Sequence, residues 1–316
     1  MAGVSGLCLT HPWCRDHVPF LGHPERVGRL DAALAGARRA GFRQEVPDVD
    51  EAAVLQAVAR VHDPALAQRL RQACQRAPAI FDSADNPISP GTYRAAVAAS
   101  GCVLAGLERA LENPEVRVFV AVRPPGHHAT RSQAMGFCFF NNVAVAAEAA
   151  VNAGAGPVLI VDFDVHHGNG TQELFYHRND VGYLSVHRYP FYPGTGSAEE
   201  IGAGKGQGFT RNVPLAAGAD DDTYLEALAM GLADLLSLFS PQVFLVSAGF
   251  DAHELDPLGG MAVSTAGFGK IGGLLGQVAK DRPLVAVLEG GYDLKALEES
   301  VAAFLSGLVK GKEAER

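Results

Sequence analysis

The feature that most constrains this chain is a short apolar run followed at once by a polar cluster. Residues 157–161 read Pro-Val-Leu-Ile-Val, and residues 162–170 read Asp-Phe-Asp-Val-His-His-Gly-Asn-Gly. The β-branched run, with glycines on both sides, predicts a buried strand of a parallel sheet, so the cluster falls at its carboxyl end. Open α/β sheets bind their ligands at that end. If the chain stays extended, Asp162, Asp164 and His166 lie on one face.

Two carboxylates and an imidazole that converge in a buried place need a counter-charge, and a divalent metal ion is the simplest one. The plainer interpretation makes Asp162 the cap of a following helix and leaves His166 and His167 as ordinary loop residues. Turn chemistry alone does not account for so many metal-ligand residue types in one short segment. The cluster therefore predicts further ligands elsewhere in the chain.

Composition limits the class of protein. The 316 residues, 48% of them hydrophobic, can bury a large core in one or two α/β domains, and the motifs favour a single domain over 1–316 with 310–316 as a frayed tail. The net charge is −9, and no basic run is longer than Arg38-Arg39. These features argue against nucleic acid or an anionic membrane as a partner.

The five cysteines are scattered and never form a Cys-x-x-Cys pair. We therefore expect a reducing, cytoplasmic compartment and no thiolate zinc site. The first ten residues lack the basic start and long apolar run of a signal peptide, and no segment approaches membrane-spanning length.

Apolar runs that end in polar residues alternate with helical patterns along the chain. Besides 157–161, the predicted strands are 4–10, 116–122, 181–187, 242–247 and 284–288, and the predicted helices are 24–40, 50–60, 64–76, 93–111, 143–152 and 224–239. This alternation predicts a doubly wound α/β fold with a parallel sheet and one active-site edge.

Two other predicted strand ends complete the cluster. Residues 123–128 read Arg-Pro-Pro-Gly-His-His, in which the prolines hold the paired histidines on a stiff loop. The strand 242–247 leads to Asp251. Asp164, His166 and Asp251 are then the candidate ligands, and three N/O ligands without a thiolate leave one position open, as in catalytic zinc sites. A water in that position would be acidified enough to supply a nucleophile near neutral pH.

Seven segments in order resemble the motif set of the zinc-dependent histone deacetylase superfamily, which also includes the acetylpolyamine amidohydrolases. The likeness begins near His23-Pro-Glu-Arg26 and covers most of the chain. The segments are Arg123-Pro-Pro-Gly-His-His128, Gly136-Phe137, Asp162 to Gly170, Ser185-Val-His187, Tyr192-Pro-Gly-Thr-Gly196, Ser247-Ala-Gly-Phe-Asp251 and Glu289-Gly-Gly-Tyr292.

The resemblance implies an arginase-like, three-layer α/β fold whose central parallel sheet is flanked by helices. It also implies removal of an acetyl or other acyl group from the side chain of an N-acylated lysine. By position, Asp164, His166 and Asp251 would hold one zinc ion, and Tyr292 would hydrogen-bond the substrate carbonyl and the oxyanion. Zinc and a phenol together stabilise developing negative charge.

The paired histidines would handle protons. By the same resemblance, His128 is the general base and later the acid, and Asp162 orients His127. Asn169 stands where many first-class members have Asp, so His128 would face a neutral amide and be less basic, as in the second class and bacterial relatives.

The resemblance also implies a narrow channel with Phe137 and Tyr192 as walls and the Gly136 carbonyl as acceptor for the substrate amide. Tyr192 replaces the more usual Phe and adds a hydroxyl. Arg26 would lie beside the channel, beneath the metal. A structural potassium ion is implied as well, held largely through backbone oxygens of Asp162, Asp164, His166, Ser185 and Val186.

Several alternatives remain at this point. A ureohydrolase would need further aspartates for two manganese ions, and a non-catalytic acyl-ligand binder would tolerate loss of Tyr292 or His127. An acetylpolyamine amidohydrolase would use the same chemistry, and Asp82 or Asp85 could receive its ammonium group or a peptide backbone. Leu258, where a gating carboxylate would favour polyamine, favours acyl-lysine. Acyl length, the metal in the cell and a homo-oligomeric state are left open.

Overall fold

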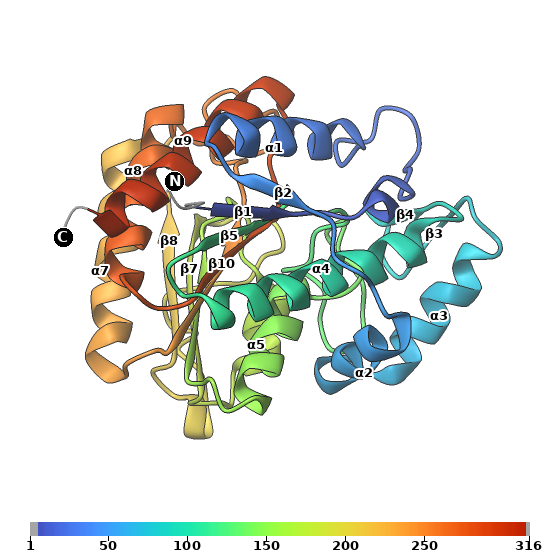
Figure 1. The fold of residues 1–316 in the computed structure, drawn as a ribbon, viewed down its shortest axis with the longest axis horizontal. Helices are drawn as coiled ribbons and strands as arrows, with labels where there is room; N and C mark the ends of the chain where they lie inside the picture. The colour runs from blue at the N-terminus through green and yellow to red at the C-terminus, as the bar shows by residue number, and fades with distance from the viewer. Residues whose placement is uncertain (1–5, 314–316) are drawn as a thin grey trace.

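The computed structural model describes residues 6–313, which form a sheet enclosed by helices (Figure 1). The strands are β1 (Gly6–Leu9), β2 (Arg43–Glu45), β3 (Ala79–Ile80), β4 (Pro87–Ile88), β5 (Arg117–Val120), β6 (Val158–Asp162), β7 (Val181–Arg188), β8 (Thr210–Leu215), β9 (Val243–Ala248) and β10 (Leu284–Leu288). The helices are α1 (Gly28–Arg39), α2 (Glu51–Val61), α3 (Pro64–Cys74), α4 (Thr92–Glu112), α5 (Asn142–Asn152), α6 (Asn169–Phe175), α7 (Asp221–Leu238), α8 (Thr265–Ala279) and α9 (Leu294–Glu313), with short 3-10 turns at Pro12–Arg15 and Gly204–Gly206.

Eight strands form one parallel sheet in the order β2-β1-β5-β10-β9-β6-β7-β8. Every residue of β5, β6, β9 and β10 is buried, which explains their nearly continuous Val, Leu, Ile, Phe and Ala content. Because all pairs are parallel, the carboxyl ends of these strands meet at one edge. That edge carries the polar segments that the sequence places after each strand.

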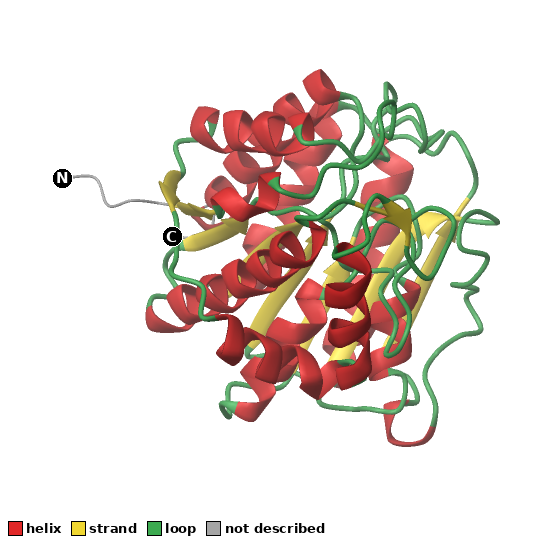
Figure 2. Ribbon diagram, turned by 90° about the vertical axis from the view of Figure 1, so that its right-hand side faces the viewer, coloured by secondary structure: helices red, strands yellow, loops and turns green. Residues whose placement is uncertain are grey.

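Helices cover both faces of the sheet, so the fold has three layers (Figure 2). On one face α4 lies over β5 and β10, and α5 lies over β6 and β9. On the other face α1 packs on α9, α9 on α8 and α8 on α7, and α7 lies over β7 and β8. This arrangement confirms the expected three-layer α/β fold with a central parallel sheet flanked by helices.

The contact between α8 and α9 is close because glycines face the neighbouring backbone. A Cβ on Gly272 would lie 2.1 Å from the Phe304 carbonyl oxygen, and one on Gly307 would lie 2.1 Å from the Gly269 carbonyl oxygen. No side chain fits at either position without separating the two helices. The glycines therefore allow the two helices to pack closely, although they lower the intrinsic helix propensity of each segment.

Several boundaries and elements differ from the prediction. The first strand begins at Gly6, and Val4 and Ser5 lie outside the described residues. Helix α1 begins at Gly28 instead of Pro24, because Glu25 is drawn into a buried ion cluster. Helix α9 extends to Glu313, so 310–313 are helical and not the frayed tail that was expected. No element was predicted at β2, β3, β4, β8, α6, α8 or α9.

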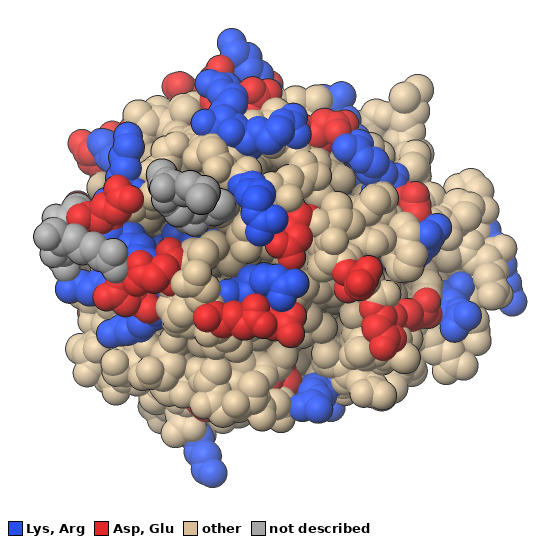
Figure 3. All heavy atoms as spheres, viewed as in Figure 1, with Lys and Arg blue, Asp and Glu red and all other residues tan. Residues whose placement is uncertain are grey.

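The physical reason is clearest at α8. Its sequence, TAGFGKIGGLLGQVA, has five glycines and so a low intrinsic helix propensity, and packing on α9 decides its conformation. Within residues 6–313, every helix is too short or too polar to span a bilayer. On the face drawn in Figure 3, basic and acidic side chains are interspersed.

We expect Gly272→Ala to destabilise the fold by about 1–3 kcal/mol, the usual cost of overpacking a tight contact. Gly273→Ala is the matched control, because a Cβ there meets no atom within 4 Å. Alanine at that helical position should add about 0.5–1 kcal/mol of stability. Urea unfolding of both variants measures the difference, and equal midpoints would contradict the packing account.

Candidate active site

Three metal-ligand side chains converge at the carboxyl edge of the sheet. Asp164 and His166 lie in the loop after β6, and Asp251 lies in the loop after β9. These strands are paired neighbours, with Asp162 opposite Ser247. One ligand atom from each of the three side chains lies within 4.8 Å of the others, and this is the only such group found among residues 6–313. The structure therefore brings together the three ligands expected from the sequence.

Backbone groups orient both carboxylates. The Val165 N–H donates to Asp251 Oδ1 at 2.9 Å, and the Gly290 N–H donates to Asp164 Oδ2 at 2.8 Å. The loops after β6, β9 and β10 are thus tied to one another through the ligands. A Cβ on Gly290 would lie 2.0 Å from Asp251 Oδ2, so glycine is required where this backbone passes the cluster.

The imidazole of His166 has only one N–H group near the two carboxylates beside it, too few to give a hydrogen bond to each of them. His166 Nδ1 lies 3.0 Å from Asp164 Oδ1 and 3.1 Å from Asp251 Oδ2. A single N–H can donate well to only one of these oxygens, and Asp251 Oδ2 has no hydrogen-bond partner although it is buried. A cation placed among the three atoms would satisfy all of them. The donor set of two carboxylates and one imidazole fits a divalent metal ion such as zinc.

The electrostatics of the cluster agree with this fit. Burial raises the pKa of Asp251 to about 7, and the charge of Asp164 adds to the effect. Burial opposes protonation of His166, but the adjacent carboxylates of Asp164 and Asp251 raise its pKa to about 10. A proton is thus held between the carboxylates, and a bound metal ion would replace that positive charge.

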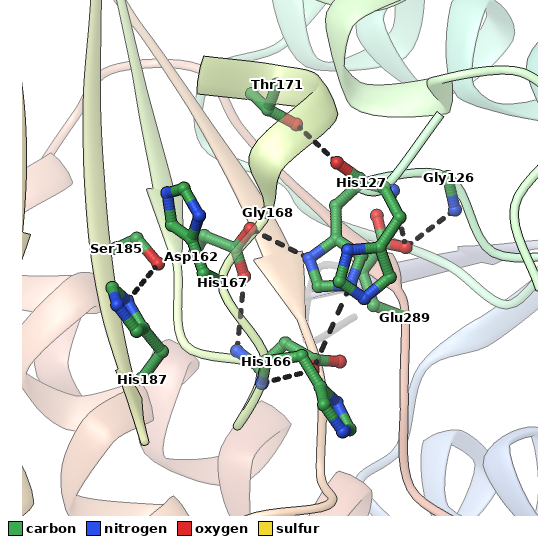
Figure 4. A network of polar contacts seen from close by, with 12 residues as sticks. Gly126, His127, Asp162, His166, His167, Gly168, Thr171, Ser185, His187 and Glu289 are labelled. Atoms are coloured by element: carbon green, nitrogen blue, oxygen red, sulfur yellow. Dashed lines mark hydrogen bonds and ion pairs between the residues drawn. The ribbon is translucent and has the colours of Figure 1, made fainter. Parts of the chain in front are cut away.

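One detail of the sequence-based picture is wrong. Strand β6 ends at Asp162, and the following residues bend instead of continuing the extended conformation. The carboxylate of Asp162 consequently stays outside the ligand group, and its Oδ1 accepts the Asp164 N–H at 3.2 Å. Its Oδ2 lies 3.0 Å from His127 Nδ1 (Figure 4). The same oxygen accepts a hydrogen bond from the Tyr183 hydroxyl at 3.1 Å.

The paired histidines occupy different electrostatic environments. Their ring centroids are 4.0 Å apart. Burial opposes protonation of His127, but the charges of Asp162 and Asp164 raise its pKa to about 10. Burial, followed by the positive charges of His127 and His166, holds the pKa of His128 well below its usual value. His127 is therefore the protonated member of the pair and His128 the neutral one.

Asn169 fixes the ring of His128. Its Oδ1 lies 2.8 Å from His128 Nδ1, and a carbonyl oxygen accepts only, so this nitrogen carries the proton. The Nε2 of a neutral His128 is then a base. Asn169 is the first residue of α6, a helix that the sequence analysis did not predict.

Glu289 holds the histidine loop against the sheet. Its Oε2 accepts the N–H groups of Gly126 at 2.7 Å and His127 at 3.2 Å (Figure 4). Its Oε1 is buried without a partner, and burial raises the pKa of this carboxyl to about 7. Glu289 appeared in the sequence only as part of a motif, and its contact with residues 126 and 127 needed the fold.

A channel of about 270 Å³ leads to this cluster. It is lined by Asp85, His128, Gly136, Phe137, His166, Tyr192, Leu258 and Tyr292. Tyr192 and Leu258 lie at the mouth, 38% and 37% exposed, and Tyr292 lies inside, 7% exposed. Asp82 takes no part, because its carboxylate binds Arg69 at 2.9 Å and the Ala134 N–H at 3.0 Å.

The arginine expected beneath the metal is not Arg26. Arg26 is exposed and lines a neighbouring groove. The buried arginine is Arg29, whose guanidinium carbon lies 4.9 Å from the centre of the Tyr292 ring. Arg29 Nε donates to the Gly291 carbonyl at 2.6 Å. Arg29 pairs with Glu25 four residues earlier, and Glu25 also binds Arg123. The contacts of this group with Arg123 and Gly291 are long-range and have no signal in the sequence.

The predicted potassium donors lie near one another at the ends of β6 and β7. Asp162 is paired with Ser185 in the sheet. Two of the donors already have protein partners, because Ser185 Oγ lies 2.9 Å from His187 Nδ1 and the Val186 carbonyl accepts the Tyr224 hydroxyl at 2.7 Å. The potassium ion stays a prediction.

Comparison with known proteins identifies the family. A family model described as the histone deacetylase domain matches residues 23–308. The chain belongs to the histone deacetylase family. Histone deacetylase 15 of Arabidopsis thaliana is 40% identical over 294 residues, which are 91% of this chain and 53% of that protein.

Two further relatives are bacterial. A histone deacetylase-like amidohydrolase of Pseudomonas aeruginosa is 42% identical over 213 residues, 66% of this chain and 56% of that protein. The crystal structure of an acetylpolyamine aminohydrolase from Burkholderia pseudomallei superposes with a TM-score of 0.85 at 32% identity and covers 96% of this chain and 98% of that one. The chain spans about half the length of the two curated relatives named here.

His62 contacts the segment that follows His127 and His128. Its Nδ1 lies 2.8 Å from the Thr130 carbonyl oxygen, and its Nε2 accepts the Asn141 N–H at 2.8 Å. Burial lowers its pKa to about 4.

This lowered pKa predicts acid destabilisation. The unfolded chain, with a histidine pKa near 6.5, binds the proton more readily, so the contribution of His62 to stability falls by about 1.4 kcal/mol per pH unit between about 6.5 and 4. His62→Gln keeps an acceptor and removes this titration, so its unfolding free energy should fall less steeply over that range. Urea unfolding at several pH values gives the two slopes, which would be equal if His62 did not titrate on unfolding.

We expect Asp251→Asn to weaken Zn²⁺ binding by at least about 100-fold, because an anionic ligand is lost. Asp256→Asn is the control: this carboxylate accepts the Tyr292 N–H at 2.7 Å but lies outside the ligand cluster. Competition with a chromophoric chelator measures both affinities. Similar losses in the two variants would show that Asp251 is no ligand.

Proposed function

We propose that this protein is a zinc-dependent amidohydrolase that removes an acetyl or other acyl group from the side-chain nitrogen of an N-acylated lysine. The observation that carries the proposal is the inner end of the channel, where the ligand His166, the neutral His128 and the phenol of Tyr292 line one cavity. A substrate amide placed there would meet a base, a hydrogen-bond donor and the metal-binding cluster together.

Asp164, His166 and Asp251 would hold the zinc ion. When bound, zinc supplies Lewis acidity, which makes water a nucleophile near neutral pH and polarises a carbonyl. The proposed carboxylate-rich ligand set also balances the charge of the ion.

His128 removes a proton from the attacking water through Nε2 and later delivers it to the departing amine nitrogen. Two contacts prepare it for this role: Asn169 fixes the tautomer, and the protonated His127 beside it keeps His128 neutral. Asp162 in turn holds His127 in its protonated form and its orientation.

Tyr292 donates its phenol hydrogen to the carbonyl oxygen as negative charge develops there. Burial holds the pKa of the phenol well above its usual value, so it stays protonated and acts only as a donor. Two contacts set its position: Asp256 accepts its backbone N–H at 2.7 Å, and Arg29 lies against its ring.

The channel suits a slender stem. Phe137 and Tyr192 provide aromatic walls for the methylenes of a lysine side chain, and Leu258 presents an apolar mouth. An acetylpolyamine is the second candidate substrate. The likeness to the acetylpolyamine aminohydrolase and the carboxylate of Asp85 at the mouth favour it.

Two accompanying proposals concern the cellular compartment and a second cation. All five cysteines, Cys8, Cys14, Cys74, Cys102 and Cys138, are free and buried, which is consistent with a cytoplasmic protein. We also retain a structural potassium ion near Asp162 and Ser185 as a proposal.

The direct test is hydrolysis by the zinc-loaded protein of an acetyl-lysine peptide, acetylputrescine and acetylspermidine, compared under the same conditions. Peptide turnover well above polyamine turnover would support the lysine deacylase, and the reverse preference would support the polyamine enzyme. Failure to hydrolyse any of the three would contradict deacetylation.

Tyr292→Phe should lower kcat by about 10²–10³-fold, the typical cost of losing an oxyanion donor. The ring, its contact with Arg29 and the zinc affinity should be preserved. Steady-state kinetics combined with a zinc titration separates these effects. A variant with nearly unchanged kcat would rule out Tyr292 as the oxyanion donor.

A further inference from the structure

Asp85 connects three segments at the mouth of the channel. It lies in the turn between β3 and β4, and it is half-buried. Its Oδ2 accepts the Gly136 N–H at 3.1 Å and the Tyr192 hydroxyl at 2.9 Å. Its Oδ1 accepts the hydroxyl of Ser83. One carboxylate therefore links the turn, the loop that carries Phe137 and the loop that carries Tyr192.

The first aromatic wall depends on this turn for its backbone conformation. Gly136 and Phe137 have φ values of +58° and +68°, a left-handed conformation that is rare for Phe. Such a conformation persists only where surrounding contacts enforce it. Asn86, next to Asp85, accepts the Phe137 N–H at 2.7 Å and donates to the Cys138 carbonyl at 3.1 Å. Asp85 and Asn86 together thus fix the wall that Phe137 forms.

The second wall is held through its side chain. Tyr192 lies in the loop after β7, and its ring is perpendicular to that of His128 at a centroid distance of 5.1 Å. Burial and the charge of Asp85 raise the pKa of its phenol, so the hydroxyl stays a donor. A phenylalanine here would keep the ring and lose the connection to Asp85. The hydroxyl of Tyr192 is therefore what joins the second wall to the first.

We propose that the hydrogen bond between Tyr192 and Asp85 fixes the width of the channel and makes Tyr192 a specificity determinant for slender, unbranched amine stems. This inference rests on the proposed function and names its substrate class further. A lysine side chain passes between walls held at one separation, whereas an aromatic stem requires the bond to break. Selectivity then depends on one charge-assisted hydrogen bond at a partly solvent-exposed site.

The test compares two peptides that differ only in the acylated stem: one contains acetyl-lysine, and the other contains acetylated 4-(aminomethyl)phenylalanine. The measured quantity is the ratio of kcat/KM for the slender and the aromatic substrate. Tyr192→Phe should lower this ratio about tenfold, the value of one charge-assisted hydrogen bond, mainly through a lower KM for the aromatic substrate. The control is Tyr189→Phe, because no hydrogen bond of the Tyr189 hydroxyl is seen among residues 6–313, and its ratio should stay within about twofold of wild type.

A double-mutant cycle tests whether the hydroxyl acts through Asp85. Asp85→Ala should lower the ratio as well, and adding Tyr192→Phe to it should have no further effect. If Asp85→Ala does not fold, Asp85→Asn replaces it and should lower the ratio in the same direction by less. An unchanged ratio in Tyr192→Phe, or an equal drop with and without Asp85, would overturn the proposal.

A binding measurement separates this inference from the proposed function. If the wild type hydrolyses neither peptide, the proposed function fails, and channel width is then read from hydroxamic acids with hexyl and benzyl linkers bound to the zinc-loaded protein. The wild type should favour the hexyl linker, and Tyr192→Phe should reduce that preference about tenfold. Equal preference in both proteins would contradict a width set by Tyr192.

Discussion

The rest of this structure depends on neutralising negative charge in a layer that water does not reach. Asp162, Asp164, Asp251 and Glu289 are all at most 1% exposed and lie at the carboxyl edge of the sheet. Such a group is stable only when each charge has a partner. His127 compensates Asp162, backbone N–H groups compensate Glu289, and the remaining pair shares a single imidazole. A metal ion bound at that pair would complete the compensation of its negative charge.

The same electrostatic arrangement gives two adjacent histidines different protonation states. His127 and His128 are equally buried, at 3% exposure, so solvent access does not distinguish them. Their partners do, since one faces a carboxylate and the other an amide oxygen. Together with burial, the charged ring of His127 lowers the pKa of His128, so His128 stays unprotonated before the reaction and its lone pair is free to accept a proton. The pairing partner thus sets the chemical role.

The sequence was sufficient for features that are encoded locally. Strand β10 has the predicted bounds, and the ligands Asp164, His166 and Asp251 meet because parallel strands end at one edge. Features that depend on distant partners were missed or misplaced. Arg29 was overlooked because its contacts with Gly291 and Tyr292 join opposite ends of the chain. Helix α8 was missed because its glycines lower its intrinsic helix propensity and are explained only by close packing on α9. Asp85 was suggested as a contact for substrate, but its bond to Tyr192 required the folded loops.

The positions of the three candidate ligands along the chain also determine when the site can form during synthesis and folding. Its ligands come from two loops that are 85 residues apart, counting from His166 to Asp251, and Gly290 orients one of them from beyond β10. A growing chain that has not yet reached Asp251 holds two of the three ligands and an incomplete sheet. All three proposed ligands could therefore hold a metal ion together only after the chain has reached Asp251 and the central strands have paired.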